Sequence, residues 1–202
     1  MLGQLQLVHH EERGLAPARE LLRVLDQVQQ HRLAAASVLR DPGAPTASLQ
    51  RQQQAVDAAL AQLNSALAQL GDSELQSSVQ DWQQAWRALV GEHAQHGLTV
   101  GDSNARHDEQ TEGLLTLIDE VAHASGLGTD SDGRRYNLQL TVLWDLPRLV
   151  EEQARVRDHG IDILLRGEVS LEDRAYLERS AEQIRQNSPC LLYTSPSPRD
   201  CS

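Results

Sequence analysis

Residues 21–40 read LLRVLDQVQQHRLAAASVLR, and their apolar side chains recur in alternating steps of four and three. The series is Leu21, Leu25, Val28, Arg32, Ala35 and Leu39. Such spacing is typical of the face that a helix buries in a bundle. A guanidinium therefore falls where the pattern asks for an aliphatic side chain. Since an Arg keeps its charge and is costly to bury alone, Arg32 requires a partner.

Two explanations are open for Arg32. In the first, a carboxylate on a neighbouring helix pairs with it, as in many structural ion pairs. In the second, the bundle opens at this point and the guanidinium, with His31 beside it, binds a small anion through its planar set of donors. The ion pair is the commoner arrangement, and the sequence leaves both open.

Composition favours an all-α protein that does not bind nucleic acid through a basic surface. The 202 residues include no Phe and only 3% aromatic side chains, while Ala, Leu and Gln are abundant. This mixture favours helices over strands. The net charge of −11 argues against nucleic acid as a partner. The sequence contains no apolar run long enough for a transmembrane helix and no signal peptide.

The pattern predicts an antiparallel up-and-down bundle of four to five helices. Helical periodicity or capping signals cover residues 2–13, 17–40, 46–70, 75–93, 103–126, 135–165 and 170–187. Gly14 to Pro17 are expected to interrupt the first of these, and Ser103 is a candidate N-cap. At Gly71 the apolar series shifts by one residue, so the helix must kink, slip in register or turn round there. A kink or short break is favoured. Pro147 should distort the long helix around it.

Residues 1–189 are predicted to form one domain, followed by a non-native, disordered tail over 190–202. Residues 190–200 read CLLYTSPSPRD, which resembles the translation of a sequencing-library transposase adapter letter for letter. Both cysteines, Cys190 and Cys201, lie in this tail. We therefore expect no disulfide or thiol site in the domain.

A second group of candidate ligand-binding residues begins the long helix. Arg135 and Tyr136 lie near its expected N-terminus, where the helix dipole favours anions and disfavours arginine. They can be solvated surface residues, or they can complete the pocket of Arg32. Arg148, directly after Pro147, is a weaker member of this group.

The sequence predicts no metal site, no cofactor and no enzymatic activity. His93 and His96 share a helix face, but no third ligand is evident. Glu120 and His123 have the spacing found in di-iron bundles, yet a second copy of that motif is absent. No phosphate-binding loop or nucleophile motif occurs in the chain.

The segment QQHRLAAASVLRDP, residues 29–42, resembles the QQHRGLSA-type element of extracytoplasmic sensor domains in bacterial chemoreceptors and related transmembrane signalling proteins. Residues 117–164, with an ASGL helix end, an acidic loop and an LP dipeptide, resemble the same group. Nitrate- and nitrite-sensing helical domains are a more distant likeness, and Arg32 is the position to which their anion-binding role carries over. Leu33, Ala34 and Ala35 stand where that element has Gly, Leu and Ser, so the chain departs from its pattern by lacking the Gly and the Ser.

The resemblance implies a ligand-sensing module of a bacterial transmembrane receptor. Such a module binds a small, anionic ligand between helices, forms a homodimer and signals by helix displacement. It lies on the periplasmic side of the inner membrane and meets the membrane only through segments outside this chain. The alternative is a soluble helical adaptor or scaffold that binds partner helices.

Overall fold

The computed structural model describes residues 2–41, 43–95, 97–127 and 133–192, and all regular structure in these ranges is helical. The elements are α1 (Leu2–Arg40), α2 (Ala47–Leu70), α3 (Ser73–Ala94), α4 (Val100–Ser125), α5 (Gly133–Leu140), the π-helical η1 (Thr141–Asp145), α6 (Leu146–Arg166) and α7 (Leu171–Leu192). They form two units, Met1–Ser131 and Asp132–Ser202, each described by itself. The all-α fold class is confirmed. The single domain over residues 1–189 stays a prediction.

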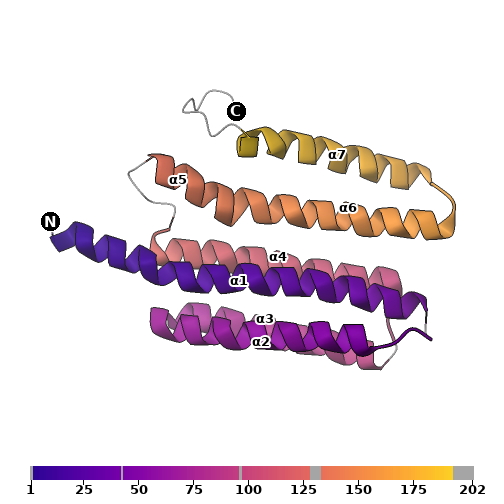
Figure 1. Ribbon diagram of the computed structural model, residues 1–202, viewed down its shortest axis with the longest axis horizontal. Helices are drawn as coiled ribbons and strands as arrows, with labels where there is room; N and C mark the ends of the chain where they lie inside the picture. Colours follow the sequence, from indigo (N-terminus) through magenta and orange to yellow (C-terminus); the bar gives the residue numbers. More distant parts are fainter. Residues whose placement is uncertain (1, 42, 96, 128–132, 193–202) are drawn as a thin grey trace. The chain divides into compact units, whose positions relative to one another are not determined.

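The first unit is an antiparallel bundle of α1 to α4, in which α1 packs beside both α2 and α4 (Figure 1). The predicted seam of α1 forms its core, since Leu21, Val28 and Ala35 are fully buried. The other three helices complete this core with side chains at helical spacing: Val56, Leu63, Leu67, Val79, Trp86, Leu114, Ile118 and Val121. Burial of these apolar faces is what holds the four helices together.

The chain turns fully around at Gly71, so the expected kink or short break there is wrong. Gly71 has a φ of 78°, a left-handed conformation that ends α2. Asp72 then caps α3 by accepting from two backbone N–H groups. Gln83 Nε2 donates to Asn64 Oδ1 at 2.9 Å, which joins the two helices side by side. Arg13 donates to the carbonyl of Leu70 at the end of α2.

The helix α1 runs without a break through Gly14 and Pro17, contrary to the predicted interruption. Pro17 lacks an N–H and disrupts the helical bonding to Arg13 locally. However, Pro17 and Ala18 are both buried, so packing in the bundle favours continuation of the helix. At Gly14 the helix approaches α4 so closely that a Cβ would overlap the Ser125 side chain.

The N-cap of α4 is Thr99 and not Ser103 as predicted. Thr99 Oγ1 accepts from the N–H of Asp102, and Asp102 Oδ2 accepts in return from the N–H of Thr99. This reciprocal pair is a capping box. The N-cap therefore lies four residues earlier than expected, and Ser103 is fully buried within the helix.

In the second unit, Pro147 is the second residue of α6, which follows the π-helical segment η1. Pro147 removes the donor that the Leu143 carbonyl would meet in a regular helix. The chain adapts by widening one turn, so that the N–H of Leu146 donates to the carbonyl of Thr141. The predicted distortion around Pro147 is thus a π-helical turn.

The predicted capping box at Ser170 opens α7. Ser170 Oγ accepts from the N–H of Asp173, and Asp173 Oδ2 accepts from the N–H of Ser170. The helix ends at Leu192, beyond the expected end at residue 187. Most of the predicted tail, residues 193–202, lies outside the described residues.

Candidate functional site

Both residues singled out on α1, His31 and Arg32, are buried, each with 1% of its surface exposed. They meet the residues His107 and Asp108 of α4. These two dipeptides are 76 positions apart and are joined by two separate polar contacts. The site is therefore built where α1 and α4 pack against each other in the first unit.

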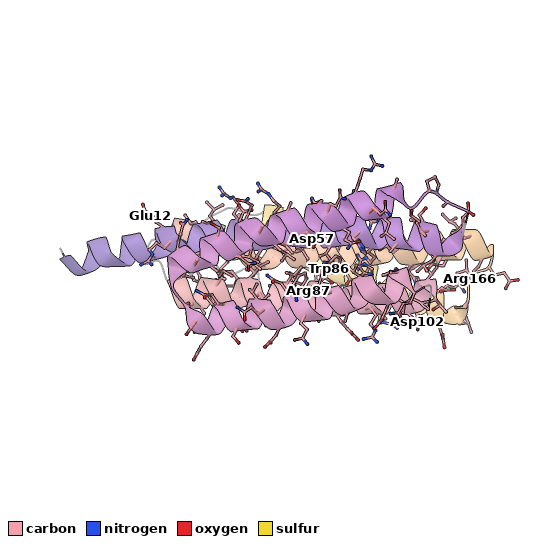
Figure 2. The ribbon with its side chains drawn as sticks, turned by 90° about the horizontal axis from the view of Figure 1, so that it is seen from below. Glu12, Asp57, Trp86, Arg87, Asp102 and Arg166 are labelled. Atoms are coloured by element: carbon pink, nitrogen blue, oxygen red, sulfur yellow. The ribbon has the colours of Figure 1, made fainter. Side chains whose placement is uncertain are left out.

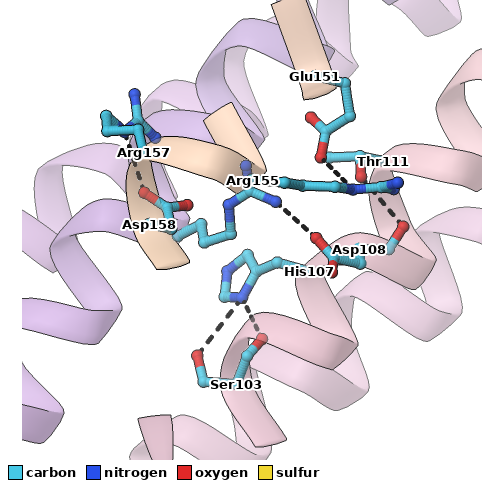
Figure 3. Close-up of polar contacts among 9 residues, drawn as sticks. Ser103, His107, Asp108, Thr111, Glu151, Arg155, Arg157 and Asp158 are labelled. Atoms are coloured by element: carbon cyan, nitrogen blue, oxygen red, sulfur yellow. Dashed lines mark hydrogen bonds and ion pairs between the residues drawn. The ribbon is translucent and has the colours of Figure 1, made fainter. Parts of the chain in front are cut away.

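The first contact is an ion pair. Arg32 Nη1 lies 2.7 Å from Asp108 Oδ1, and the Asp108 side chain is 40% exposed. Thr111, one turn further along α4, donates from its Oγ1 to the backbone carbonyl of Asp108 (Figure 3). Of the two explanations that the sequence leaves open, the carboxylate partner is thus present. Because the carboxylate is partly hydrated, a buried cation here is balanced by an anion that reaches water.

The second contact joins two imidazoles. His107 Nδ1 lies 2.7 Å from the carbonyl oxygen of Ser103 (Figure 3). A carbonyl only accepts, so this nitrogen carries a hydrogen and, in the neutral ring, Nε2 is the acceptor. His31 Nδ1, 2.8 Å from His107 Nε2, must therefore donate. One backbone carbonyl thus fixes the tautomers of both rings.

A third imidazole and two indoles enclose this pair. His93 Nε2 on α3 lies 3.2 Å from Ser103 Oγ, and the His93 ring centroid is 5.8 Å from that of His31. Trp86 meets His31 edge-on, with 4.8 Å between the ring centroids. Trp82 stacks against Trp86 and donates from its indole nitrogen to the Gln110 carbonyl.

Electrostatics keep the imidazoles neutral near pH 7. Burial, with a further contribution from His93, lowers the pKa of His31 to about 3. Burial and then the neighbouring His31 lower the pKa of His107 to about 3, with Arg32 adding to the effect. Burial also lowers the pKa of His93, against the influence of Glu92. Neutral rings are consistent with both hydrogen bonds of the pair.

A hollow of about 220 Å³ lies on the other side of Trp86, between α2 and α3. Asp57, Trp86 and Arg87 border it, as Figure 2 shows near the middle of the bundle. The hollow also has amide groups from Asn64 and Gln83 in its wall. Within the described ranges, no three His, Cys, Asp or Glu side chains are arranged to hold a metal ion.

The second predicted group of ligand residues lies in the second unit. Arg135 is in α5, and its side chain is outside the described part. Tyr136 is 37% exposed, and Arg148 is exposed and donates to the carbonyl of Trp144 at 3.2 Å. An approach of these residues to Arg32 stays a prediction.

Sequence reasoning missed His107, Asp108 and the role of Ser103. The signal was available, because the apolar series Leu114, Ile118 and Val121 extends backwards through Thr111 to His107 and Ser103. The extension consists of polar residues, which normally indicate a solvent-exposed helix face. All of its members are fully buried.

The architecture is similar to that of known proteins. The family model described as "NIT: Nitrate and nitrite sensing" matches residues 23–190. Among solved structures, the chain is similar to one titled "Structure of the NasR transcription antiterminator", with 17% sequence identity and a TM-score of 0.76. That match covers 96% of this chain and 53% of the other, and it shows a shared fold. No curated protein matches the chain.

Proposed function

Because the chain belongs to the nitrate and nitrite sensing family, we propose that its first helical unit binds nitrate or nitrite and that Arg32 holds the anion. The observation that supports this best is a guanidinium with 1% exposure whose counter-ion, Asp108, is 40% exposed. A guanidinium presents five donors in one plane and suits planar oxyanions. A buried cation of this kind offers a small anion a poorly hydrated site.

We propose that the anion exchanges with the Asp108 carboxylate. The Asp108 carboxylate is already partly hydrated. It can therefore leave the guanidinium at a lower free-energy cost than a fully buried carboxylate could. The exchange removes a charge contact between α1 and α4. A shift of about 1–2 Å between two packed helices is then enough to signal. The ligand must bind the shifted arrangement more tightly than the original one.

Calorimetric titration and thermal shift with sodium nitrate and sodium nitrite test the site, with sodium chloride at equal ionic strength as the reference. We expect both oxyanions to raise the melting temperature of the wild type more than chloride does. Arg32→Gln should abolish this difference, and Arg32→Lys should weaken it, since an ammonium lacks the planar fork. Arg19→Gln on the same helix is the control, because Arg19 is 72% exposed.

Equal responses of the wild type and Arg32→Gln to nitrate would contradict the role of Arg32. Tyr136→Phe and Arg148→Gln test the second group in the same assay. If these residues complete the pocket, each variant should lower nitrate affinity severalfold. Unchanged affinities would remove them from the site.

We further propose that the chain is the sensing part of a homodimeric transmembrane receptor and lies outside the cytoplasm. The support is the likeness of residues 29–42 and 117–164 to receptor sensor domains. No helix in the described ranges is long and apolar enough to cross a membrane. Sequencing the gene on both sides of this segment tests the proposal, since it requires transmembrane segments flanking the domain.

A soluble helical adaptor is the second candidate. Large apolar side chains are exposed around the connection between α6 and α7, with Leu164 at 81% and Leu171 at 84%. Such side chains suit contact with a partner helix. The adaptor is favoured if the complete gene encodes no transmembrane segment and no oxyanion shifts the melting temperature.

A further inference from the structure

We propose that the anion binds together with a proton, and that His31, oriented by His107, is the group that takes up this proton. The inference rests on the proposed function and concerns the same site. It follows from the direction of two hydrogen bonds and from the charges around the buried rings.

The hydrogen-bond directions select the atom that accepts the proton. In the neutral pair, His31 Nδ1 donates to His107 Nε2, and His107 Nδ1 donates to the Ser103 carbonyl. A proton added to His31 Nε2 leaves both bonds in place. It also strengthens the first of them, because the donor becomes an imidazolium.

A proton on His107 is disfavoured by the same geometry. Its vacant nitrogen is Nε2, which lies 2.8 Å from the Nδ1 of His31. Protonation there would set two donors against each other. The incoming proton therefore enters at His31 Nε2, and His107 positions that ring. Because the hydrogen between His31 Nδ1 and His107 Nε2 can shift along their bond, the two rings share the positive charge.

Charged groups from the surrounding helices explain why the site stays neutral without an anion. On α1, the cation of Arg32 opposes a positive charge on His107, and so does the deep burial of that ring. From α3, His93 opposes protonation of His31, while the carboxylate of Glu92 acts on His93. From α4, Asp108 balances Arg32 at 2.7 Å.

On the side of α2, Asp57 shares a hollow with Arg87 and Trp86. Trp86 separates these two opposite charges from His31, whose ring it meets edge-on at 4.8 Å between centroids. Among the charged side chains, Arg32 acts on His107, and His107 shares a hydrogen bond with His31. An anion held by the guanidinium therefore acts on this pair of rings through His107.

An incoming anion changes the charge balance of the site. The charges of Arg32 and Asp108 cancel before binding. When the anion replaces the Asp108 carboxylate at the guanidinium, the displaced carboxylate stays on α4, so the region gains one negative charge. Asp108 is 40% exposed and partly screened by water, whereas an anion at a guanidinium with 1% exposure is screened less. The added charge therefore favours the imidazolium form of His31. Uptake of one proton from solvent restores neutrality.

Linkage makes this effect reciprocal, so protonation strengthens anion binding to the same degree that the anion favours protonation. Affinity should rise as the pH falls, by up to about tenfold per pH unit while the pH lies between the pKa values of the empty and the occupied site. Nitrate is the suitable probe, because it stays fully ionised over this range.

Calorimetric titration of the full chain with sodium nitrate at pH 7.5, 6.5 and 5.5 tests the proposal. At each pH, two buffers of different ionisation enthalpy report the number of protons taken up. We expect the affinity of the wild type to rise at least threefold from pH 7.5 to 5.5, with net proton uptake. His31→Gln should bind nitrate with an affinity that does not change with pH.

His123→Gln on α4 is the matched control, since His123 is exposed and should leave the pH dependence intact. Wild-type binding without proton uptake and without pH dependence would overturn the inference and leave the anion site standing. An unchanged pH dependence in His31→Gln would also overturn the assignment. Absence of nitrate binding at every pH would instead refute the proposed function, and the inference with it. The number of protons taken up is measured on the wild type. It therefore tests the coupling of nitrate binding to protonation even if His31→Gln does not fold.

Discussion

Gly14 on α1 lies so close to Ser125 on α4 that no side chain fits between the two helices. A Cβ at Gly14 would overlap both Cβ and Oγ of Ser125 and would lie 3.1 Å from Leu127 Cδ1. The hydroxyl of Ser125 is itself buried and donates to the Val121 carbonyl. The glycine therefore sets the spacing of the two helices that carry the candidate site.

Gly14→Ala should destabilise the protein by about 1–3 kcal/mol, because the helices must move apart to accept the methyl group. Chemical denaturation monitored by circular dichroism measures this loss. Gly91→Ala is the control, since a Cβ at Gly91 in α3 would have no neighbouring atom within 4 Å. There the better helix propensity of Ala should add about 0.5–1 kcal/mol. Equal stability of Gly14→Ala and the wild type would contradict the close approach.

Asp108→Asn tests the exchange of anion and carboxylate at Arg32. The variant loses the charge that lies 2.7 Å from the guanidinium, so its stability without nitrate should fall by about 1–2 kcal/mol. Its nitrate affinity should rise severalfold, because the competing carboxylate is gone. Glu109→Gln is the control, since Glu109 is 66% exposed and pairs with Arg106 at 3.7 Å. A nitrate affinity of Asp108→Asn below that of the wild type would argue against exchange.

Apolar periodicity predicted the helices and the core well, but it could not decide how the chain passes Gly71. The seam through Leu21, Val28 and Ala35 is buried as expected, because a stripe of that spacing can be buried only along one helix face. At Gly71 a shift of one residue fits a kink as well as a reversal. The contact between Asn64 and Gln83 distinguishes the two, and it depends on residues far apart in the sequence.

Of the candidate site, the sequence predicted the part on α1 and missed the part on α4. Arg32 was visible because a charge interrupts an apolar series on its own helix. His107 was not, since its neighbours Ser103 and Thr111 are polar and the face they share resembles a solvated one. Only the packing of α4 against α1 shows that this polar face is buried.

Thr99→Ala should destabilise the start of α4 by about 1 kcal/mol, because the capping box loses the acceptor of the Asp102 N–H. Amide hydrogen exchange should show faster exchange over the first turn of α4. Thr116→Ala is the control on the same helix, since Thr116 is exposed and donates to a carbonyl within the helix. If both variants have the same stability, the capping interaction contributes little.

Stability should fall as the pH drops from 7.5 to 4.5, with His31 and His107 as the cause. Their pKa values are about 3 in the folded protein and about 6.5 when unfolded, so over this range the unfolded chain binds more protons. Such a difference makes stability rise with pH. The expected loss on acidification is about 2–5 kcal/mol for the pair, measured by urea denaturation at each pH.

Asp102 and Asp173 do not account for a loss in this window. Hydrogen bonds from Thr99 and from Ser170 lower the pKa of Asp102 and Asp173, respectively, below the usual value of 3.8. The stability that these groups contribute is present above their unfolded pKa and is lost only at more acidic pH. His31→Gln should therefore flatten the slope between pH 6.5 and 4.5, while His123→Gln at an exposed position should not. The same slope in His31→Gln and the wild type would show that the buried imidazoles do not govern the acid sensitivity of the fold.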